Sequence, residues 1–479
     1  MNGWLTHIPQ KYWAYLALLL WGTLCLLLLQ HTPYGIDENA ARVLLLTWSV
    51  ADNVVSPIVT LGLPDLRAVI LAPVGFLWTG NVFVAKVATM FVVSGLGWAF
   101  YAWQKRKGDS EGALLATGLL LISPIILEQI DTISVAPYLL ITFILGAWSD
   151  RIYRESPQIF GGMYFAQLFL CLVSITLHPA GLAYPLVLLW AWYKSPLDQQ
   201  RSYFIGGIVF AVLLALILTM GWGQVEWFNN PIRSLSRVIS GSPRSEALGI
   251  LDLISGVGIL IILLLVISKQ AVNLWSDFLG RILVFALVIG LLASDETWST
   301  LALVVCLYWG LPLLLPTYIN SSNDFWGQRG AAMLLLFILS TTFMLVDKAR
   351  YQRLMAGYLS PRDHLIKTLA EDSENFLNDD PTQPKQATKP VRIASQWPGL
   401  TMLACRCDAL PLPPPTKDSD ALLAMLRGIN YLIFDPRDPL NSSLARNLAT
   451  MDAGKVETIA LQQGGVIVEI KNPPSVQNP

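Results

Sequence analysis

The chain has 479 residues, of which 54% are hydrophobic and only 14% are charged, and its mean hydropathy is +0.52. A soluble domain is about a quarter charged, so this composition excludes an ordinary soluble protein and indicates a polytopic helical membrane protein. The net charge of −1 provides no basic excess for binding nucleic acid. The five cysteines do not have the spacing of a zinc site.

Apolar blocks of about 17–22 residues recur along the first part of the chain, and this is the length that crosses a bilayer as a helix. We predict about eleven transmembrane helices, near residues 11–30, 82–103, 112–128, 132–148, 160–177, 179–193, 203–222, 248–268, 278–294, 298–316 and 329–347. The stretch 66–79 is shorter and contains Pro73 and Gly75, so we predict that it lies in the membrane surface or re-enters the membrane. The first block is too long for a cleavable signal peptide and lacks a small-residue cleavage site.

The positive charges predict the orientation of these helices. If 66–79 does not cross, eleven of the seventeen lysines and arginines before residue 348 fall on one side of the membrane. Cytoplasmic loops are enriched in Lys and Arg, so this side is predicted to be cytoplasmic. The N-terminus is then inside, and the loops 31–81 and 223–247 and everything after 348 are outside.

The first external loop begins with two adjacent carboxylates, Asp37 and Glu38, in the stretch YGIDENAAR. The next residues, 40–50, have the pattern of an amphipathic helix lying on the membrane interface. Asp37 is therefore either the N-cap of this helix or a general base that acts on a substrate. A cap does not explain the second acid, Glu38. The residues predicted to share the apolar face are Ala40, Val43, Leu44, Thr47 and Trp48.

Further acids are predicted on the same side of the membrane. Asp131 is predicted to begin a helix, so it is either a second functional carboxylate or a helix cap. Glu128 precedes it in the stretch EQIDT and is a secondary candidate. Asp295 and Glu296 are predicted to be residues of a tight turn.

Cations are scarcer on the outer side. Arg67 begins the interfacial segment, and Lys86 lies about one turn inside the next span, where it either reaches the surface or faces a site. The loop 223–247 contains arginines that either are solvated or bind a phosphate through paired N–H donors. His178 is either a hydrogen-bonded structural residue or a ligand. The loop arginines are Arg233, Arg237 and Arg244.

Acids and cations are thus predicted to gather at the outer ends of several spans. Carboxylates can accept the proton of a hydroxyl group, and cations can hold a phosphate and stabilise it as a leaving group. We therefore predict an outer-face site for a phosphate-bearing lipid. A transporter or flippase of lipid-linked glycans is an alternative, although such proteins usually carry ionisable groups near the bilayer midplane. A scaffold without catalytic activity is a further alternative.

The composition changes after residue 347. We predict a transmembrane catalytic domain over 1–347, a helix and linker over 348–390, and a small extracytoplasmic α/β domain over 391–479. Cys405 and Cys407 could pair as a disulfide or bind a metal, but no His or Cys cluster accompanies them. The predicted elements are strands at 391–395, 430–435, 455–461 and 465–470, and helices at 349–377, 420–428 and 442–451.

The order of these features resembles the GT-C class of membrane glycosyltransferases, and most of all the bacterial branch related to protein mannosyltransferases and aminoarabinose transferases. The similarity rests on YGIDENAAR, PDLRAVILAPVGFLWTGNVFVAKVAT, EQIDTISVAPYLLITFILGAWSDRIYR and SQWPGLTMLACRCDALPLP followed by NYLIFDPRD. The resemblance implies an enzyme of the bacterial cytoplasmic membrane that uses a polyprenyl-phosphate-linked sugar at the outer leaflet. The sugar, the acceptor (a lipid, glycan or protein) and any divalent metal are left open.

The resemblance also implies roles for individual residues. Asp37 matches the catalytic acid of the first external loop, and Asp131 matches a second acid. Arg67 is the nearest match to a basic residue that contacts the donor phosphate, although Arg67-Ala68-Val69 replaces the family's Lys-Pro-Pro. The expected mechanism is a single displacement that inverts the anomeric centre. In it Asp37 is the base, and Glu38 or Asp131 orients the acceptor or a divalent cation.

Overall fold

The computed structural model divides the chain into two compact units, which are described separately. The helical unit contains residues 1–29, 65–70 and 84–351, and the composite unit contains residues 30–64, 71–83 and 352–479. The structure describes parts of 19–29 and of 391–471, together with residues 36, 38–52, 66–78, 81–106, 110–155, 160–193, 205–215, 277–293, 297–305, 307–308 and 361–378.

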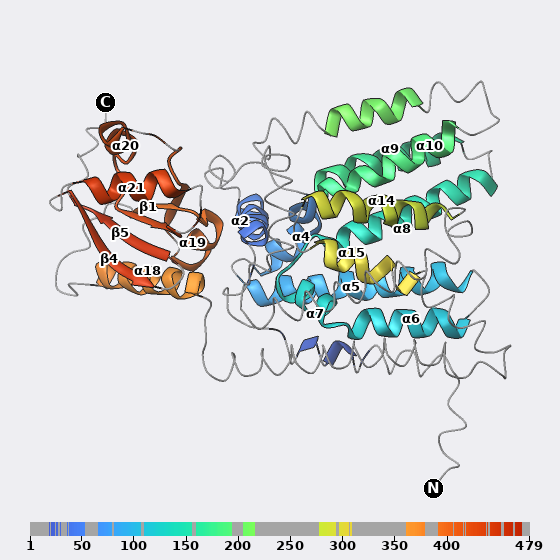
Figure 1. Ribbon diagram of the computed structural model, residues 1–479. Helices are drawn as coiled ribbons and strands as arrows, with labels where there is room; N and C mark the ends of the chain where they lie inside the picture. The colour runs from blue at the N-terminus through green and yellow to red at the C-terminus, as the bar shows by residue number, and fades with distance from the viewer. Residues whose placement is uncertain are drawn as a thin grey trace, which may run out of the picture. The chain divides into compact units, whose positions relative to one another are not determined.

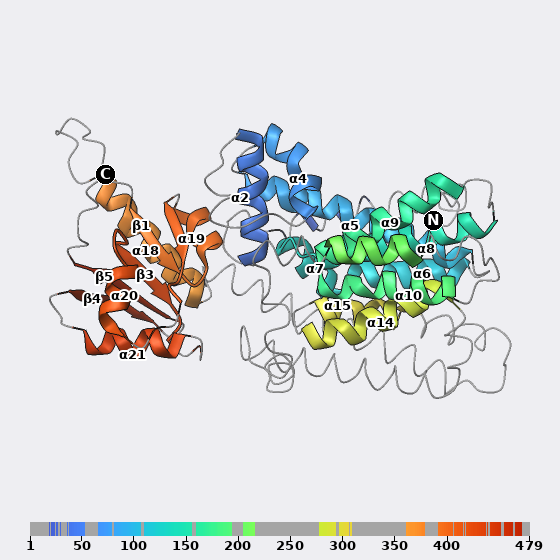
Figure 2. The same cartoon turned by 90° about the horizontal axis from the view of Figure 1, so that it is seen from above.

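The helical unit is a bundle of apolar helices. Figures 1 and 2 show α5, α6, α8, α9, α10 and α14 lying with roughly aligned axes. Its described elements are α5 (Val82–Lys105), α6 (Ser110–Ile122), α7 (Pro124–Asp131), α8 (Ala136–Glu155), α9 (Phe160–Leu177), the short 3₁₀ helix η3 (Pro179–Leu182), α10 (Ala183–Tyr193), a helix at Ile205–Ala215, α14 (Phe278–Ala293) and α15 (Thr297–Val305).

Large apolar side chains cover the outside of this bundle. Water does not favour so many exposed aromatic and aliphatic groups, whereas lipid hydrocarbon does. The bundle therefore has the surface of a membrane protein. Residues that leave more than half of their surface exposed include Phe91, Trp98, Leu114, Phe165 and Phe169.

Among the described residues, one helix is both long and apolar enough to cross a membrane, namely Val82–Lys105. A second span results if Ile125–Asp131 and Ala136–Glu155, which meet at a bend of 110°, are counted as one. Shorter apolar helices lie at Gly162–Leu177, Ile205–Ala215 and Phe278–Gly290. The predicted total of eleven spans remains a prediction, since 248–268 and 329–347 lie outside the described residues.

The helices predicted near 82–103, 160–177 and 278–294 are confirmed by α5, α9 and α14. The block predicted as one helix over 112–128 is instead two helices. α6 ends at Ile122 and α7 begins at Pro124, whose ring cannot continue the hydrogen bonding of a helix interior. Pro179 likewise begins a separate 3₁₀ turn before α10.

The composite unit contains a five-stranded sheet of order β2-β1-β3-β5-β4. β1 pairs in parallel with β2 and β3, whereas β5 pairs antiparallel with β3 and β4. Figure 1 shows α18 on one face of the sheet and α20 and α21 on the other. The bounds are α18 (Pro361–Asn378), β1 (Arg392–Ser395), α19 (Pro398–Cys405), β2 (Asp408–Pro411), α20 (Ser419–Met425), β3 (Tyr431–Phe434), α21 (Ser442–Thr450), β4 (Val456–Gln462) and β5 (Gly465–Ile470).

The central strand β3 is buried along its whole length because helices cover both faces of the sheet. Leu432 and Phe434 join an apolar core with Leu422, Leu444 and other residues of α20 and α21. The predicted strands and these two helices are confirmed. Two elements were not predicted from the sequence, the short helix α19 and the edge strand β2.

The helix predicted over 40–50 is confirmed as α2 (Glu38–Asp52), while its place on the membrane interface remains a prediction. α4 (Leu66–Leu77) matches the short segment 66–79. At about 1.5 Å per residue, the 12-residue α4 is too short to cross a bilayer. α2 is buried more widely than predicted, since Ala41, Leu46 and Ser49 are also buried and Trp48 is only half-buried. A Cβ added at Gly75 of α4 would lie 2.8 Å from Cγ2 of Thr47, so α4 covers one side of α2.

We predict that Gly146→Ala destabilises the helical unit. A Cβ at this position of α8 would lie 2.5 Å from Cε2 of the buried Tyr184 ring, and overpacking of this kind costs about 1–3 kcal/mol. Thermal unfolding of the detergent-solubilised protein should occur at a lower temperature. Gly95→Ala in α5 is the control, because no atom lies within 4 Å of its added Cβ. Equal unfolding temperatures for the two variants would contradict the packing described here.

Candidate functional site

The helical unit contains a buried ion pair formed by two of the candidate site residues. Nζ of Lys86, on the second turn of α5, lies 2.9 Å from Oδ1 of Asp131. Lys86 has 0% of its surface exposed and Asp131 has 5%. The interpretation that Lys86 reaches the membrane surface is therefore wrong, because its ammonium group points to a buried carboxylate.

Asp131 is the last residue of α7, and α8 begins only at Ala136. The prediction that Asp131 begins a helix, and with it the alternative role as an N-cap, is therefore wrong. A carboxylate is disfavoured at a helix C-terminus, where the helix dipole is negative. The ammonium group of Lys86 offsets this unfavourable position.

Arg67 lies in the same region of the helical unit. Its Nη1 donates a hydrogen bond of 2.9 Å to the backbone carbonyl of Ile133, and only 5% of the Arg67 surface is exposed. The turn that connects α7 to α8 thus contacts Arg67 through its backbone and Lys86 through Asp131. The structure brings together three of the predicted residues, Arg67, Lys86 and Asp131.

The α7–α8 turn has an unusual backbone. Ile133 has a φ of +54°, a left-handed conformation that β-branched residues rarely adopt. The turn ends α7 in a Schellman motif, in which N–H of Ile133 bonds to C=O of Ile130 at 3.3 Å and N–H of Ser134 bonds to C=O of Gln129 at 3.0 Å. Glycine normally occupies this position. A non-glycine residue there costs about 1–3 kcal/mol, and such strain is concentrated at functional sites.

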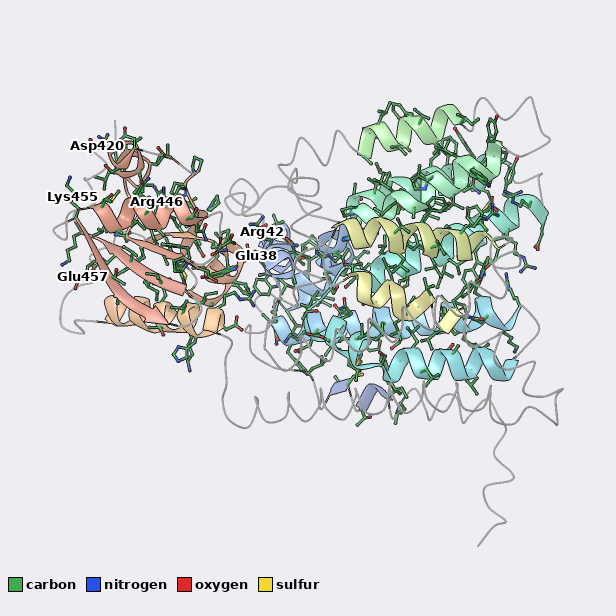
Figure 3. The ribbon with its side chains drawn as sticks, viewed as in Figure 1. Glu38, Arg42, Asp420, Arg446, Lys455 and Glu457 are labelled. Carbon is green, nitrogen blue, oxygen red and sulfur yellow. A yellow bond between two sulfur atoms is a disulfide. The ribbon has the colours of Figure 1, made fainter. Side chains whose placement is uncertain are left out.

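Glu38 lies in the composite unit, on the first turn of α2 (Figure 3). Its Oε1 accepts hydrogen bonds of 2.8 Å from N–H of Gly399 and from Nε of Arg42, and its Oε2 accepts one of 3.0 Å from N–H of Leu400. Both carboxylate oxygens therefore bind the N-terminus of α19. Burial raises the pKa of the Glu38 carboxyl, and the charge of Arg42 and the two backbone amides oppose this effect.

Several other predicted residues have local structural contacts or lie outside the described part of the chain. Nδ1 of His178 accepts a hydrogen bond of 3.1 Å from N–H of Ala180 and so caps η3. Glu128 is exposed on α7. The residues outside the described part are Asp37, Arg233, Arg237, Arg244, Asp295 and Glu296.

The described residues contain no group of three or more His, Cys, Asp or Glu side chains that could hold a metal ion. Cys405 and Cys407 form a disulfide. Of the two alternatives left open for them, a disulfide and a metal site, the structure contains the disulfide.

The sequence analysis missed several groups that contact the candidate residues: the amides of Gly399 and Leu400, the carbonyl of Ile133, and Arg42. Arg42 follows Glu38 by four residues, a spacing that predicts an ion pair on a helix. Pro398 occupies the first position of α19, where proline is common. The sequence had no signal for the left-handed backbone at Ile133.

No family model and no curated protein matches this sequence. Solved structures of the oligosaccharyltransferase from Archaeoglobus fulgidus are similar to it. The apo form has a TM-score of 0.48 at 11% identity, over 89% of this chain and 70% of that one. The archaeal AglB in complex with an inhibitory peptide and a dolichol-phosphate has a TM-score of 0.50 at 12% identity, over the same shares of the two chains.

The similarity to AglB is one of fold. This oligosaccharyltransferase is a membrane glycosyltransferase of the GT-C class, and the match extends over most of both chains. The resemblance to the GT-C class that was recognised from the sequence is therefore confirmed at the level of the fold.

The Lys86–Asp131 pair generates a prediction about stability. Lys86→Met or Asp131→Asn alone leaves one buried charge without its counterion, which costs about 3–5 kcal/mol. The double variant removes both charges and should recover most of this loss. The free energy of unfolding, measured for all three variants in the same detergent, checks the prediction. A double variant as unstable as the sum of the two single variants would contradict it.

The raised pKa of Glu38 generates a prediction about pH. The folded unit binds this proton more tightly than the unfolded chain does, whose carboxyl has the ordinary pKa of 4.5. The stability contributed by protonation is therefore fully present below about pH 4.5 and is lost as the pH rises through the folded-state pKa. Glu38→Gln should remove this part of the pH dependence. Thermal unfolding of both proteins between about pH 4 and pH 8 would reveal it, and identical slopes would refute it.

Proposed function

We propose that this protein is a GT-C-type glycosyltransferase that moves a sugar from a polyprenyl-phosphate-linked donor to an acceptor hydroxyl on the outer face of the membrane. The observation that carries the proposal is the buried Lys86–Asp131 ion pair beside Arg67, within a chain of GT-C-like fold. Ionisable groups are expensive to bury among apolar helices and usually mark a functional site.

A lipid phosphate is the donor chemistry that suits these residues. The similar AglB structure contains a dolichol-phosphate and an inhibitory peptide. In this chain Arg67 is the proposed phosphate ligand, since a guanidinium group offers several N–H donors to an anion. Lys86 and the arginines of the loop 223–247, namely Arg233, Arg237 and Arg244, are proposed to add positive charge around the phosphate.

The proposed reaction is one displacement at the anomeric carbon. The carboxylate of Asp37 accepts the proton of the acceptor hydroxyl as the acceptor oxygen forms its bond to the anomeric carbon. The bond from that carbon to the phosphate oxygen breaks, and its electron pair leaves with the polyprenyl phosphate. The cations stabilise the charge on this leaving group. Because the attacking and leaving oxygens are on opposite sides, the configuration at the anomeric carbon inverts.

The strained turn beside Asp131 is consistent with a positioning role for this acid. Arg67 and Lys86 both hold the turn, through the carbonyl of Ile133 and the carboxylate of Asp131 respectively. We propose that Asp131 orients the acceptor, or a divalent cation if the reaction uses one. Glu128 and His178 are assigned no step, because one is exposed and the other caps η3.

The proposed location is the bacterial cytoplasmic membrane, with the N-terminus in the cytoplasm and the site at the outer leaflet. The support for this orientation is the excess of Lys and Arg in the predicted cytoplasmic loops. A lipid-linked donor carries its own activation, so a reaction at this face needs no nucleotide. The proposed partners are the lipid-linked sugar and an acceptor that is a lipid, a glycan or a protein.

The proposal predicts that Asp37→Asn strongly reduces turnover. A general base contributes about 10²–10⁴-fold to the rate, so kcat should fall by at least about a hundredfold. The assay uses the protein in lipid nanodiscs with a panel of synthetic polyprenyl-phosphate hexoses and pentoses and a membrane extract as the acceptor source. Mass spectrometry of the released polyprenyl phosphate measures turnover.

Asn39→Asp is the matched control, because Asn39 is exposed on the first turn of α2 and the change adds a carboxylate two positions away. This variant should keep its turnover. Release of polyprenyl phosphate by Asp37→Asn at the wild-type rate would exclude Asp37 as the base. If wild-type protein binds the lipids but releases no polyprenyl phosphate, this result would favour a flippase or a scaffold.

A further inference from the structure

The two chain neighbours of Asp37 are both held by the C-terminal part of the composite unit. The carbonyl of Ile36 accepts a hydrogen bond of 3.3 Å from Nη2 of Arg362, on α18, and Ile36 is fully buried. On the other side, Glu38 accepts the bonds from Gly399 and Leu400 at the start of α19. Contacts to residues more than 320 positions away thus flank the residue proposed as the base.

The contact between Glu38 and α19 is favourable for both, because the helix start has free N–H donors and Glu38 has acceptor oxygens. The first turn of a helix has backbone N–H groups without an internal acceptor, which a side chain at the N-cap often satisfies. Here Trp397 precedes Pro398, and its side chain has no acceptor oxygen. Glu38 supplies two oxygens to the second and third residues of α19 instead, and its negative charge is favourable at this end of the helix.

Gly399 allows this contact to be close. A Cβ at this position would lie 2.8 Å from Cγ of Arg42 and 3.0 Å from Oε1 of Glu38, so any larger residue would push α19 away from α2. Arg42 also holds the carboxylate from its own helix, with Nε 2.8 Å from Oε1. The α2–α19 contact therefore depends on the sequence of both helices.

We propose that Glu38 is a positioning residue. Through α19, and together with the bond from Arg362 to Ile36, the C-terminal part of the composite unit holds Ile36 and Glu38 so that Asp37, between them in the chain, meets the acceptor. This inference rests on the proposed function, in which Asp37 is the base. It assigns a catalytic purpose to the C-terminal region, which supports the segment that contains the proposed base. The contacts of Glu38 then explain why two acids stand side by side in YGIDENAAR.

The first test measures whether the contact holds the segment, without any need for turnover. Glu38→Gln keeps one carbonyl oxygen but replaces the other acceptor with an amide donor, and Gly399→Ala separates the helices without changing a charge. Amide hydrogen exchange of the full-length protein in nanodiscs should become about tenfold faster in peptides that cover 36–44 in both variants. Peptides from α8 should exchange at the wild-type rate.

The second test measures turnover, with the polyprenyl-phosphate sugar panel described above. Each variant should lower kcat about tenfold, and the double variant should lower it by little more than either one, because both changes break the same contact. Independent effects would multiply to about a hundredfold. The acid limb of the kcat profile against pH should also shift, since it reports the base. A variant that only loses folded enzyme would have a lower kcat at every pH, but its acid limb would fall at the same pH as in the wild type.

Two control variants match the chemistry of the test variants. Glu155→Gln breaks an i,i+4 pair with Arg151 on an exposed face of α8, and Gly162→Ala adds a methyl group where no atom lies within 4 Å. Both should keep wild-type kcat and exchange.

If Glu38→Gln and Gly399→Ala speed up exchange but leave kcat and its pH profile unchanged, the positioning role is wrong and the proposed function stands. If the exchange of 36–44 does not change, the inference is likewise overturned. If wild-type protein releases no polyprenyl phosphate from any donor, the proposed function fails and the positioning role fails with it.

Discussion

The ion pair between Lys86 and Asp131 constrains the helical unit at the point where α7 turns into α8. A lysine with no exposed surface cannot remain charged among apolar helices unless an anion lies within reach, and the cost of breaking such a pair is several kcal/mol. The position of α5 and the end of α7 are therefore linked. Arg67 strengthens the link by binding the carbonyl of Ile133 in the same turn.

Glu38 and Asp131 lie at helix ends of opposite polarity. Glu38 meets the N-terminus of α19, where a negative charge is favourable and the amides need acceptors. Asp131 lies at the C-terminus of α7, where a negative charge is unfavourable. Glu38 therefore has a sufficient structural reason to be an acid, whereas the helix end at Asp131 offers none, and the Asp131 carboxylate is instead paired with the ammonium group of Lys86. This contrast is the reason for which we propose Asp131, and not Glu38, as the acid that orients the acceptor.

Local patterns in the sequence predicted much of the fold. Alternation and short apolar runs located β1, β3, β4 and β5, and the long apolar block located α5. The helix α19 was missed because it has only eight residues and its N-terminus is capped by Glu38, which lies about 360 positions earlier in the chain. Long-range capping of this kind has no local signal.

The candidate site was predicted in part for a similar reason. Charge and position along the chain identified Arg67, Lys86 and Asp131, and these residues do lie together. The role of Asp131 at a helix start was wrong because the predicted span 132–148 begins four residues too early, since α8 begins at Ala136 with Pro137 in its first turn. Ile133 adopts the conformation that glycine usually takes, so composition indicated a helix where the chain bends by 110°.

A reaction at a membrane surface sets a particular demand on its base. A lipid-linked donor arrives from the bilayer, so the base must be fixed at the boundary between the bilayer and water. A short helix on the interface cannot provide this by itself, since isolated helices of about 15 residues are marginal in water. In this protein α4 covers one side of α2 through Gly75 and Thr47, and α19 binds its first turn through Glu38. The proposed base then precedes a helix that is fixed at its first turn and along its side.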